Sequence, residues 1–279
     1  MDVSGTISDV NGLLEHVLTL NSQFKGQLWW RGQRSSTWDL SPSVFRSEQR
    51  TCDEQNYIAR YQHKAPSRHA SVPGYGDRAG WLFLMQHYRL PTRLLDWTES
   101  PLIGCWFASE VDPALQEHSE KVQDTDGALY ALSPYMLNSE QIQQDALILP
   151  DDPKAVNSIN CAFSREDTDV DYVVAVRPSE VDTRLLVQLS VFTLHGRRLD
   201  LEGLANREKF LRKFLVPKTA KPKIREELKH LGVRESSIYP DLEHLAIDVK
   251  STKFRRQQKP RPIPPQVIVA PPRDPEESS

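Results

Sequence analysis

The sequence predicts an α+β fold in which one mixed domain is built around a central sheet. Segments with helical hydrophobic spacing and segments with strand-like character both occur along the chain, and no internal repeat is visible. The chain has 279 residues, of which 38% are hydrophobic, so a core can form without a metal or a disulfide. We expect this domain to span residues 1–255, followed by a disordered, proline-rich tail at 256–279.

The first third of the chain alternates between helices and one aromatic strand. Residues 7–20 carry apolar side chains with helical spacing along one face, which predicts an amphipathic helix. The segment QLWWRGQ at 27–33 is bounded by glycines and is typical of a strand. Further helices are expected at 53–65 and 81–88, the second ending before Pro91 because the α conformation is disfavoured ahead of proline.

A buried helix is expected at 100–110, SPLIGCWFASE. Ser100 can cap the free amides of its first turn, and Pro101 suits the first helical position. The helix is apolar nearly all round, so it should lie in the centre of the fold. Two strands follow at 127–133 and 171–178, separated by a polar connection with a short helix.

The last third of the domain begins with the longest strand-like run, residues 184–195, in which Gln188 shares a face with Ser190. Another element at 208–216 ends before a proline. A short helix, IREELKHLG, stops at a glycine. The segment PDLEHLAIDVK places its apolar residues on one stripe and predicts a terminal helix.

Composition excludes several functional classes. The formal charge of −3 argues against a protein that coats nucleic acid by bulk charge. No apolar run approaches the roughly 20 residues of a membrane span, and the first residues lack an export signal, so we expect a cytoplasmic protein without membrane contact. Three widely spaced cysteines suit a reducing compartment, and the histidines form no ligand motif, so no metal is expected.

The first candidate site surrounds Arg31. All six tryptophans fall between residues 29 and 106, and polar groups are interleaved with them in WWRGQRSSTW. An arginine that follows two tryptophans at a strand end can hold an anion or a planar group beside an aromatic face, with Gln33 as a neighbouring polar contact. The alternative is that these aromatic residues simply pack a core concentrated in this half of the chain.

A second cluster of polar side chains lies within fourteen residues, on loops that flank the buried helix. Its members, with the adjacent Trp97, are His87, Thr92, Arg93, Asp96, Thr98 and Ser100. A phosphate or carboxylate would be stabilised at the helix N-terminus beside the last two of these residues. The structural alternative is that Asp96 or Ser100 caps the helix and that Arg93 pairs with Asp96.

These motifs carry a family resemblance. The segments LWWRGQ, LMQHYRLPTRLLDWTESPLIGCWFAS, RLLVQLSVFTLHG and LKHLGVRESSIYPDLEHLA, in this order, resemble the FRG domain family over residues 7–248. That family is named for a Phe-Arg-Gly motif, which here is Trp30-Arg31-Gly32. The resemblance implies a bacterial, mobile-element-associated effector that acts in toxin or anti-phage conflict.

The order of the motifs is also similar to that of ADP-ribosyltransferases, which implies NAD as substrate. Arg31 would then grip the pyrophosphate or ribose, and Thr98 and Ser100 would order the site. The position of the late catalytic glutamate falls on Gln188, which is neutral and cannot stabilise a cationic transition state as a carboxylate does. The missing charge would come from Asp96, Asp241 or Glu243; a hydrolytic variant would use Asp96 and Glu243 as a carboxylate pair.

The other hypothesis is a binding module that recognises a nucleotide, a nucleic-acid end or a partner protein without turnover. A carboxylate that faces Arg31 across a cleft would favour catalysis, with a protein or nucleic acid as the acceptor. A closed ion pair of Asp96 with Arg31 or Arg93, and no cleft, would favour binding. The proline-rich tail is a candidate ligand for a protein partner.

Overall fold

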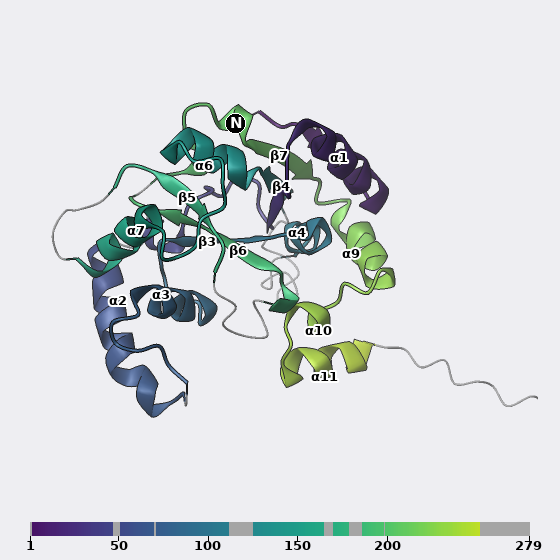
Figure 1. Ribbon diagram of the computed structural model, residues 1–279. Helices are drawn as coiled ribbons and strands as arrows, with labels where there is room; N and C mark the ends of the chain where they lie inside the picture. Colours follow the sequence, from purple (N-terminus) through teal and green to yellow (C-terminus); the bar gives the residue numbers. More distant parts are fainter. Residues whose placement is uncertain are drawn as a thin grey trace, which may run out of the picture.

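The computed structural model describes residues 2–46, 51–69, 71–111, 125–164, 170–178, 186–197 and 199–251. These residues form one seven-stranded mixed sheet covered by helices, which confirms the expected α+β fold (Figure 1). The tail expected at 256–279, the boundary at residue 255 and the first part of the run at 184–195 lie outside the described residues.

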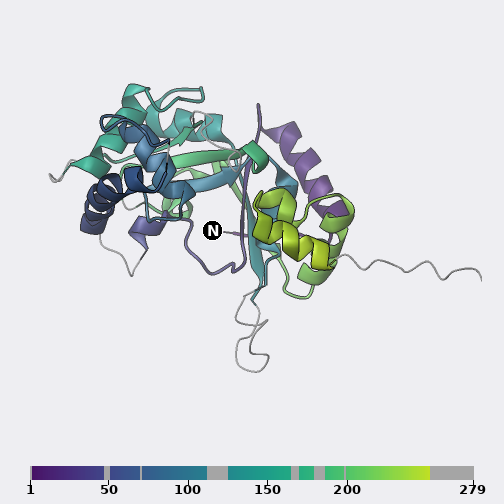
Figure 2. The ribbon, with the colours of Figure 1, turned by 90° about the horizontal axis from the view of Figure 1, so that it is seen from below.

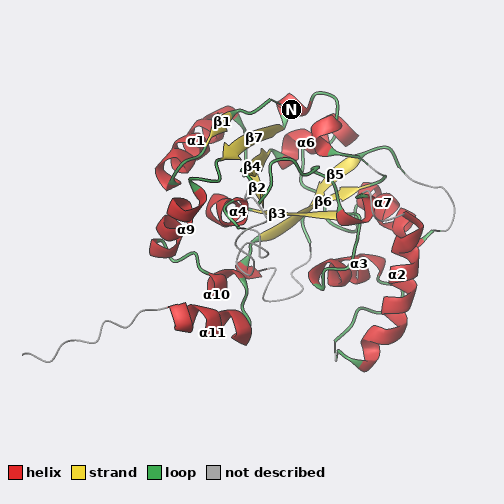
Figure 3. Ribbon diagram, turned by 180° about the vertical axis from the view of Figure 1, so that it is seen from behind, coloured by secondary structure: helices red, strands yellow, loops and turns green. Residues whose placement is uncertain are grey.

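The sheet has the strand order β1-β7-β4-β2-β3-β6-β5. All neighbouring strands are antiparallel except the pair of β1 and β7 (Figure 3). In this order the strands comprise Gly5–Thr6, Leu211–Val216, Gly127–Leu132, Trp29–Gln33, Leu94–Thr98, Ser190–His195 and Val173–Val176.

The sheet splits between β2 and β3. Strand β2 pairs with β4 along its whole length, and β3 pairs with β6 in the same way. Between β2 and β3 the one pair of residues in register is Trp30 and Thr98, so the strands diverge on either side of it. The sheet therefore consists of a first half, β1-β7-β4-β2, and a second half, β3-β6-β5.

One face of the sheet carries two separate groups of helices. Trp30 and Thr98 pair directly, so their side chains share this face. Helices α1 (Val10–Gln23), α4 (Pro101–Ala108) and α9 (Lys221–His230) cover the first half. Helices α2 (Thr51–Lys64), α3 (Arg78–His87) and α7 (Pro153–Phe163) cover the second half (Figure 2).

The opposite face is covered mainly by α6 (Pro134–Ile142), which packs beside β5 over a third apolar cluster. The short helices α10 (Glu235–Ile238) and α11 (Leu242–Ser251) follow α9 at one end of the molecule (Figure 1). The described residues also include four short 3₁₀ turns: η1 Ser43–Phe45, η2 Ala65–Ser67, η3 Leu201–Gly203 and η4 Arg207–Lys209. No described helix combines the length and the hydrophobicity that crossing a bilayer requires.

Helix α4 is the expected buried helix and packs unusually close to β2. Ser100 caps it by accepting a hydrogen bond from the Ile103 amide, as expected. A Cβ atom at Gly32 would lie 2.0 Å from the Gly104 carbonyl oxygen, and one at Gly104 would lie 2.9 Å from Cβ of Trp30. The two glycines therefore allow the helix to touch the strand that carries Arg31.

Three expectations about local structure are wrong. Residues 94–98 form the central strand β3, not a loop, since both faces of LLDWT are covered and the segment lacks a clean alternation. The long run at 184–195 is a strand only from Ser190, because Leu189 adopts a left-handed backbone with φ of 48°. Gln188 consequently lies in the turn that precedes β6. Two helices, α6 and α7, occupy the connection where one was expected.

Candidate functional site

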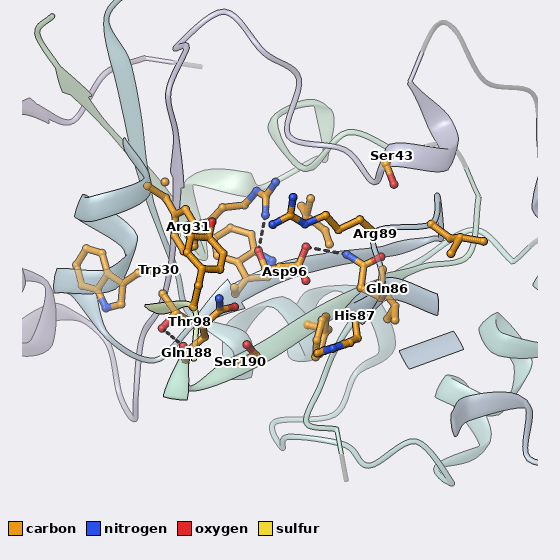
Figure 4. A pocket seen from close by; sticks show the side chains of 18 of the residues that line it. Trp30, Arg31, Ser43, Gln86, His87, Arg89, Asp96, Thr98, Gln188 and Ser190 are labelled. Carbon is orange, nitrogen blue, oxygen red and sulfur yellow. Dashed lines mark hydrogen bonds between the residues drawn. The ribbon is translucent and has the colours of Figure 1, made fainter. Parts of the chain in front are cut away.

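A cleft of about 540 Å³ opens where the two halves of the sheet diverge (Figure 4). Its walls come from β2, β3 and β6, from the C-terminal ends of α3 and α4, and from the residue after α10. The side chains that matter below are Arg31, Arg46, Gln86, His87, Arg89, Asp96, Thr98, Glu110, Gln188 and Tyr239. The volume lies within the range of about 300–1,000 Å³ for small-molecule sites.

Arg31 spans the gap between the two halves. Its Nη1 donates to the main-chain oxygen of Asp96 at 2.7 Å, an oxygen that the divergence of β2 and β3 leaves available (Figure 4). Its Nε is buried and makes no hydrogen bond with the described residues. Burial lowers the pKa of this guanidinium to about 10; Arg46 adds to the shift, whereas Asp96 opposes it. The hydrogen-bonding capacity of the Arg31 guanidinium is therefore only partly used within the described residues.

Two further arginines line the same cleft. Arg46 follows η1, and Arg89 follows α3 with a left-handed backbone, φ 61°. The Arg89 guanidinium lies over the ring of Tyr239, 6.0 Å from its centroid. Among the described residues, neither arginine forms an ion pair with a carboxylate, so three cationic groups converge on a cleft that holds two acidic side chains.

Asp96 presents its carboxylate on β3 at the floor of this cleft. The side chain is exposed, and its Oδ2 accepts a hydrogen bond from Nε2 of Gln86 at 2.7 Å (Figure 4). Oε1 of Gln86 in turn accepts a hydrogen bond from the hydroxyl of Thr92. Asp96 thus presents a carboxylate beside Arg31 in an open cleft, and the two side chains form no ion pair.

Glu110 is the second acidic side chain in the lining, just beyond α4. Burial raises its pKa; the positive charges of Arg225, Arg34 and Arg89 oppose the shift, and Glu235 reinforces it. Glu110 therefore lies in a more buried environment than the exposed Asp96.

The structure brings six of the residues predicted from sequence to the cleft lining: Arg31, His87, Asp96, Trp97, Thr98 and Gln188. Five others do not line it: Gln33, Thr92, Arg93, Ser100 and Glu243. Glu243 lies on the exposed surface of α11, so the carboxylate pair expected from Asp96 and Glu243 does not line one cleft.

Arg93 does not pair with Asp96. Its guanidinium is buried and forms an ion pair with Glu54, with Nη2 2.8 Å from Oε2. Nη1 also donates to the Gly196 main-chain oxygen at 2.8 Å. Asp96 is exposed in the cleft, whereas Arg93 precedes β3 and is buried against Glu54 of α2.

The order of the motifs placed Thr98 and Gln188 in the catalytic site, but both side chains make hydrogen bonds within the fold. Thr98 donates to the main-chain oxygen of Gln188 at 2.6 Å and accepts from the Ser100 amide. Nε2 of Gln188 donates to the Ile238 main-chain oxygen at 3.0 Å, which ties the turn before β6 to α10. Gln33 similarly donates from Nε2 to the Asp39 main-chain oxygen.

Sequence reasoning missed Arg46, Gln86, Arg89, Glu110 and Tyr239. Gln86 and Arg89 flank His87 within the conspicuous QHYR segment, so that motif contained a signal. The others lie in segments distant from it along the chain, and only the folded sheet brings them together. Within the described ranges, no group of three or more His, Cys, Asp or Glu side chains is arranged to hold a metal ion.

Comparison with known families identifies one domain. Residues 26–117 match the model of the FRG domain, which confirms the FRG resemblance over these residues. Strands β2 and β3, helices α2, α3 and α4, and the cleft residues Arg31, Gln86 and Asp96 all fall inside this match. No curated protein and no solved structure matches the chain.

Proposed function

We propose that this chain, which carries an FRG domain over residues 26–117, binds a nucleotide in the cleft and cleaves the bond between nicotinamide and ribose in NAD. The observation that carries the proposal is the state of Arg31. A buried Nε without a partner among the described residues, next to the positive charge of Arg46, favours an incoming anion.

A diphosphate is the anion that suits this cleft. Three arginines line it without carboxylate partners among the described residues, and arginine binds phosphate oxygens with a rigid fork of donors. The lining also includes two partly buried aromatic side chains, Phe107 and Tyr239, against which the planar rings of a nucleotide can pack. A ligand with both features is a dinucleotide such as NAD.

Asp96 supplies the charge for the chemical step. When the bond from C1′ of the ribose to the nicotinamide nitrogen breaks, its electron pair leaves with neutral nicotinamide and the ribose becomes oxocarbenium-like. A carboxylate at the cleft floor stabilises that positive charge. Water, or a hydroxyl, amine or carboxylate of a protein or nucleic-acid acceptor, then bonds to C1′ and releases any proton it carries. As an effector, the protein would consume NAD or modify a target.

The test is nicotinamide release from NAD by the purified wild type and two variants, Arg31→Ala and Asp96→Asn, with and without cell lysate. We expect Asp96→Asn to lower the rate about 100-fold or more while NAD still binds. Arg31→Ala should weaken binding. Arg197→Ala is the matched control, because Arg197 is exposed and pairs with Asp171 outside the cleft. Absence of nicotinamide release by the wild type, both with and without lysate, would refute catalysis.

A non-catalytic nucleotide-binding module is the second candidate. The observation that favours it is Gln188, a neutral residue whose amide is committed to Ile238 at the position where motif order expects a glutamate. Binding of NAD without nicotinamide release, abolished by Arg31→Ala, would support this function.

A further inference from the structure

The environment of Asp96 contains a chain of hydrogen bonds with only one possible direction. The oxygen of an ionised carboxylate can only accept, so Gln86 must turn its Nε2 amine toward Oδ2 of Asp96, 2.7 Å away. Its carbonyl Oε1 then faces Thr92, and because that oxygen also only accepts, the Thr92 hydroxyl must donate. The reverse orientation of the amide would place two acceptors face to face.

Thr92, at the far end of this chain of hydrogen bonds, is held in the core. Thr92 is fully buried, and its hydroxyl oxygen accepts a hydrogen bond from the amide of Leu94 at 3.2 Å, the first residue of β3. Thr92 therefore holds a fixed position relative to the strand that carries Asp96. Gln86 lies at the end of α3, so the chain connects that helix to β3 at the cleft.

We propose that Gln86 is a positioning residue, oriented by Thr92, which holds the Asp96 carboxylate in one rotamer and leaves Oδ1 for the ligand. No described residue donates a hydrogen bond to Oδ1. The inference rests on the proposed function, because it gives Asp96 its role at the developing positive charge. Gln86 and Thr92 act through Asp96 and not by contact with the reacting atoms.

The direction of this chain of hydrogen bonds determines which variants test it. Gln86→Leu keeps the size of the side chain and removes both bonds. Thr92→Val keeps the shape of the side chain and removes the hydroxyl that orients Gln86, whereas Thr92→Ser keeps the hydroxyl. For Gln86→Leu and Thr92→Val we expect kcat for nicotinamide release to fall about 10- to 100-fold with KM nearly unchanged, because a displaced catalytic group loses rate. Thr92→Ser should retain most of the wild-type rate.

A double-mutant cycle separates positioning from general damage. If Gln86 acts through Asp96, Gln86→Leu adds nothing to the loss already caused by Asp96→Asn. Independent, multiplying losses, or a change in KM alone, would overturn the proposal. Urea denaturation of each variant identifies any that is merely unfolded.

A measurement without turnover keeps this inference separate from the proposed function. In the ¹⁵N-labelled wild type, the side-chain amide signals of Gln86, assigned by their loss in Gln86→Leu, report its two bonds. We expect them to shift in Asp96→Asn and in Thr92→Val, and to stay near their wild-type positions in Thr92→Ser. Unmoved signals would overturn the positioning role even if NAD is cleaved. Shifted signals from a protein that does not cleave NAD would support the positioning role while refuting the proposed function.

Discussion

Arg31 and Arg93 differ in how fully the fold satisfies their guanidinium groups. Arg93 has a buried carboxylate partner in Glu54 and a carbonyl partner in Gly196. Arg31 reaches one main-chain oxygen and keeps a buried Nε without a described partner. The sequence singles out both arginines as candidates, but their different roles depend on residues far away along the chain. Arg93 therefore belongs to the core and Arg31 to the cleft.

Arg93→Met should destabilise the protein by about 3–5 kcal/mol, because it removes the guanidinium from its buried ion pair with the Glu54 carboxylate. Urea denaturation measures the change. The control Arg197→Met removes an exposed ion pair and should cost about 1 kcal/mol or less. Arg93→Met with wild-type stability and no affinity for ADP-ribose would contradict a structural role and place Arg93 in the ligand site.

His195 is a second buried group with a measurable consequence. Its Nδ1 donates to the Leu199 carbonyl, and its Nε2 accepts from the hydroxyl of Thr193. Burial lowers its pKa from 6.5 to about 3, opposed by the bond to Leu199 and reinforced by Arg93 and Arg31. The folded protein therefore resists a proton that the unfolded chain accepts below pH 6.5.

The stability that depends on neutral His195 is fully present above pH 6.5 and is lost as the pH falls toward 3. Its contribution to the free energy of unfolding should fall by up to about 1.4 kcal/mol per pH unit in that window. Urea denaturation at pH 7 and pH 5 measures the decline. His195→Gln cannot titrate, so its stability should decline less steeply; equal slopes would show that other groups account for the loss.

Among the elements, α4 and β2 show what local sequence can predict. Ser100 and Pro101 mark the start of α4, and its uniform hydrophobicity indicates central burial, both of which the structure bears out. Strand β3 could not be recognised in the same way. It is covered on both faces except at Asp96, so alternation is absent, and its neighbours β2 and β6 are distant in sequence.

The close packing of α4 on β2 predicts a severe effect of Gly32→Ala. The added Cβ would lie 2.0 Å from the Gly104 carbonyl oxygen and 2.3 Å from the Ala108 nitrogen, both backbone atoms that cannot move independently of the helix. We expect a loss of several kcal/mol or failure to fold, measured by denaturation. Gly76→Ala, where a Cβ would meet nothing within 4 Å, is the control. Equal stability of the two variants would contradict the packing described.

At the scale of the whole molecule, the site depends on the split of the sheet. The sequence identified Arg31, Asp96 and the neighbouring segments because their polar residues interrupt apolar runs. It could not identify Arg46, Glu110 or Tyr239 as their companions, because contact between them requires β2 and β3 to diverge. The apolar stripe at 240–250 correctly predicts helix α11, although Leu242 and Val249 on that stripe are exposed.

The distribution of charge also belongs to this scale. The chain carries a formal charge of −3, while the cleft is lined by three arginines and two carboxylates. A negatively charged ligand is therefore attracted to the cleft locally rather than by the protein as a whole, and its affinity should decrease as salt rises.

Calorimetric titration with ADP-ribose tests the central claim most directly, because this ligand contains the diphosphate and ribose without the scissile bond. We expect binding by the wild type, a loss of about 10- to 100-fold in affinity for Arg31→Ala, and an unchanged affinity for Arg197→Ala. Absence of binding, or equal affinity of the wild type and Arg31→Ala, would contradict a nucleotide site between the two halves of the sheet.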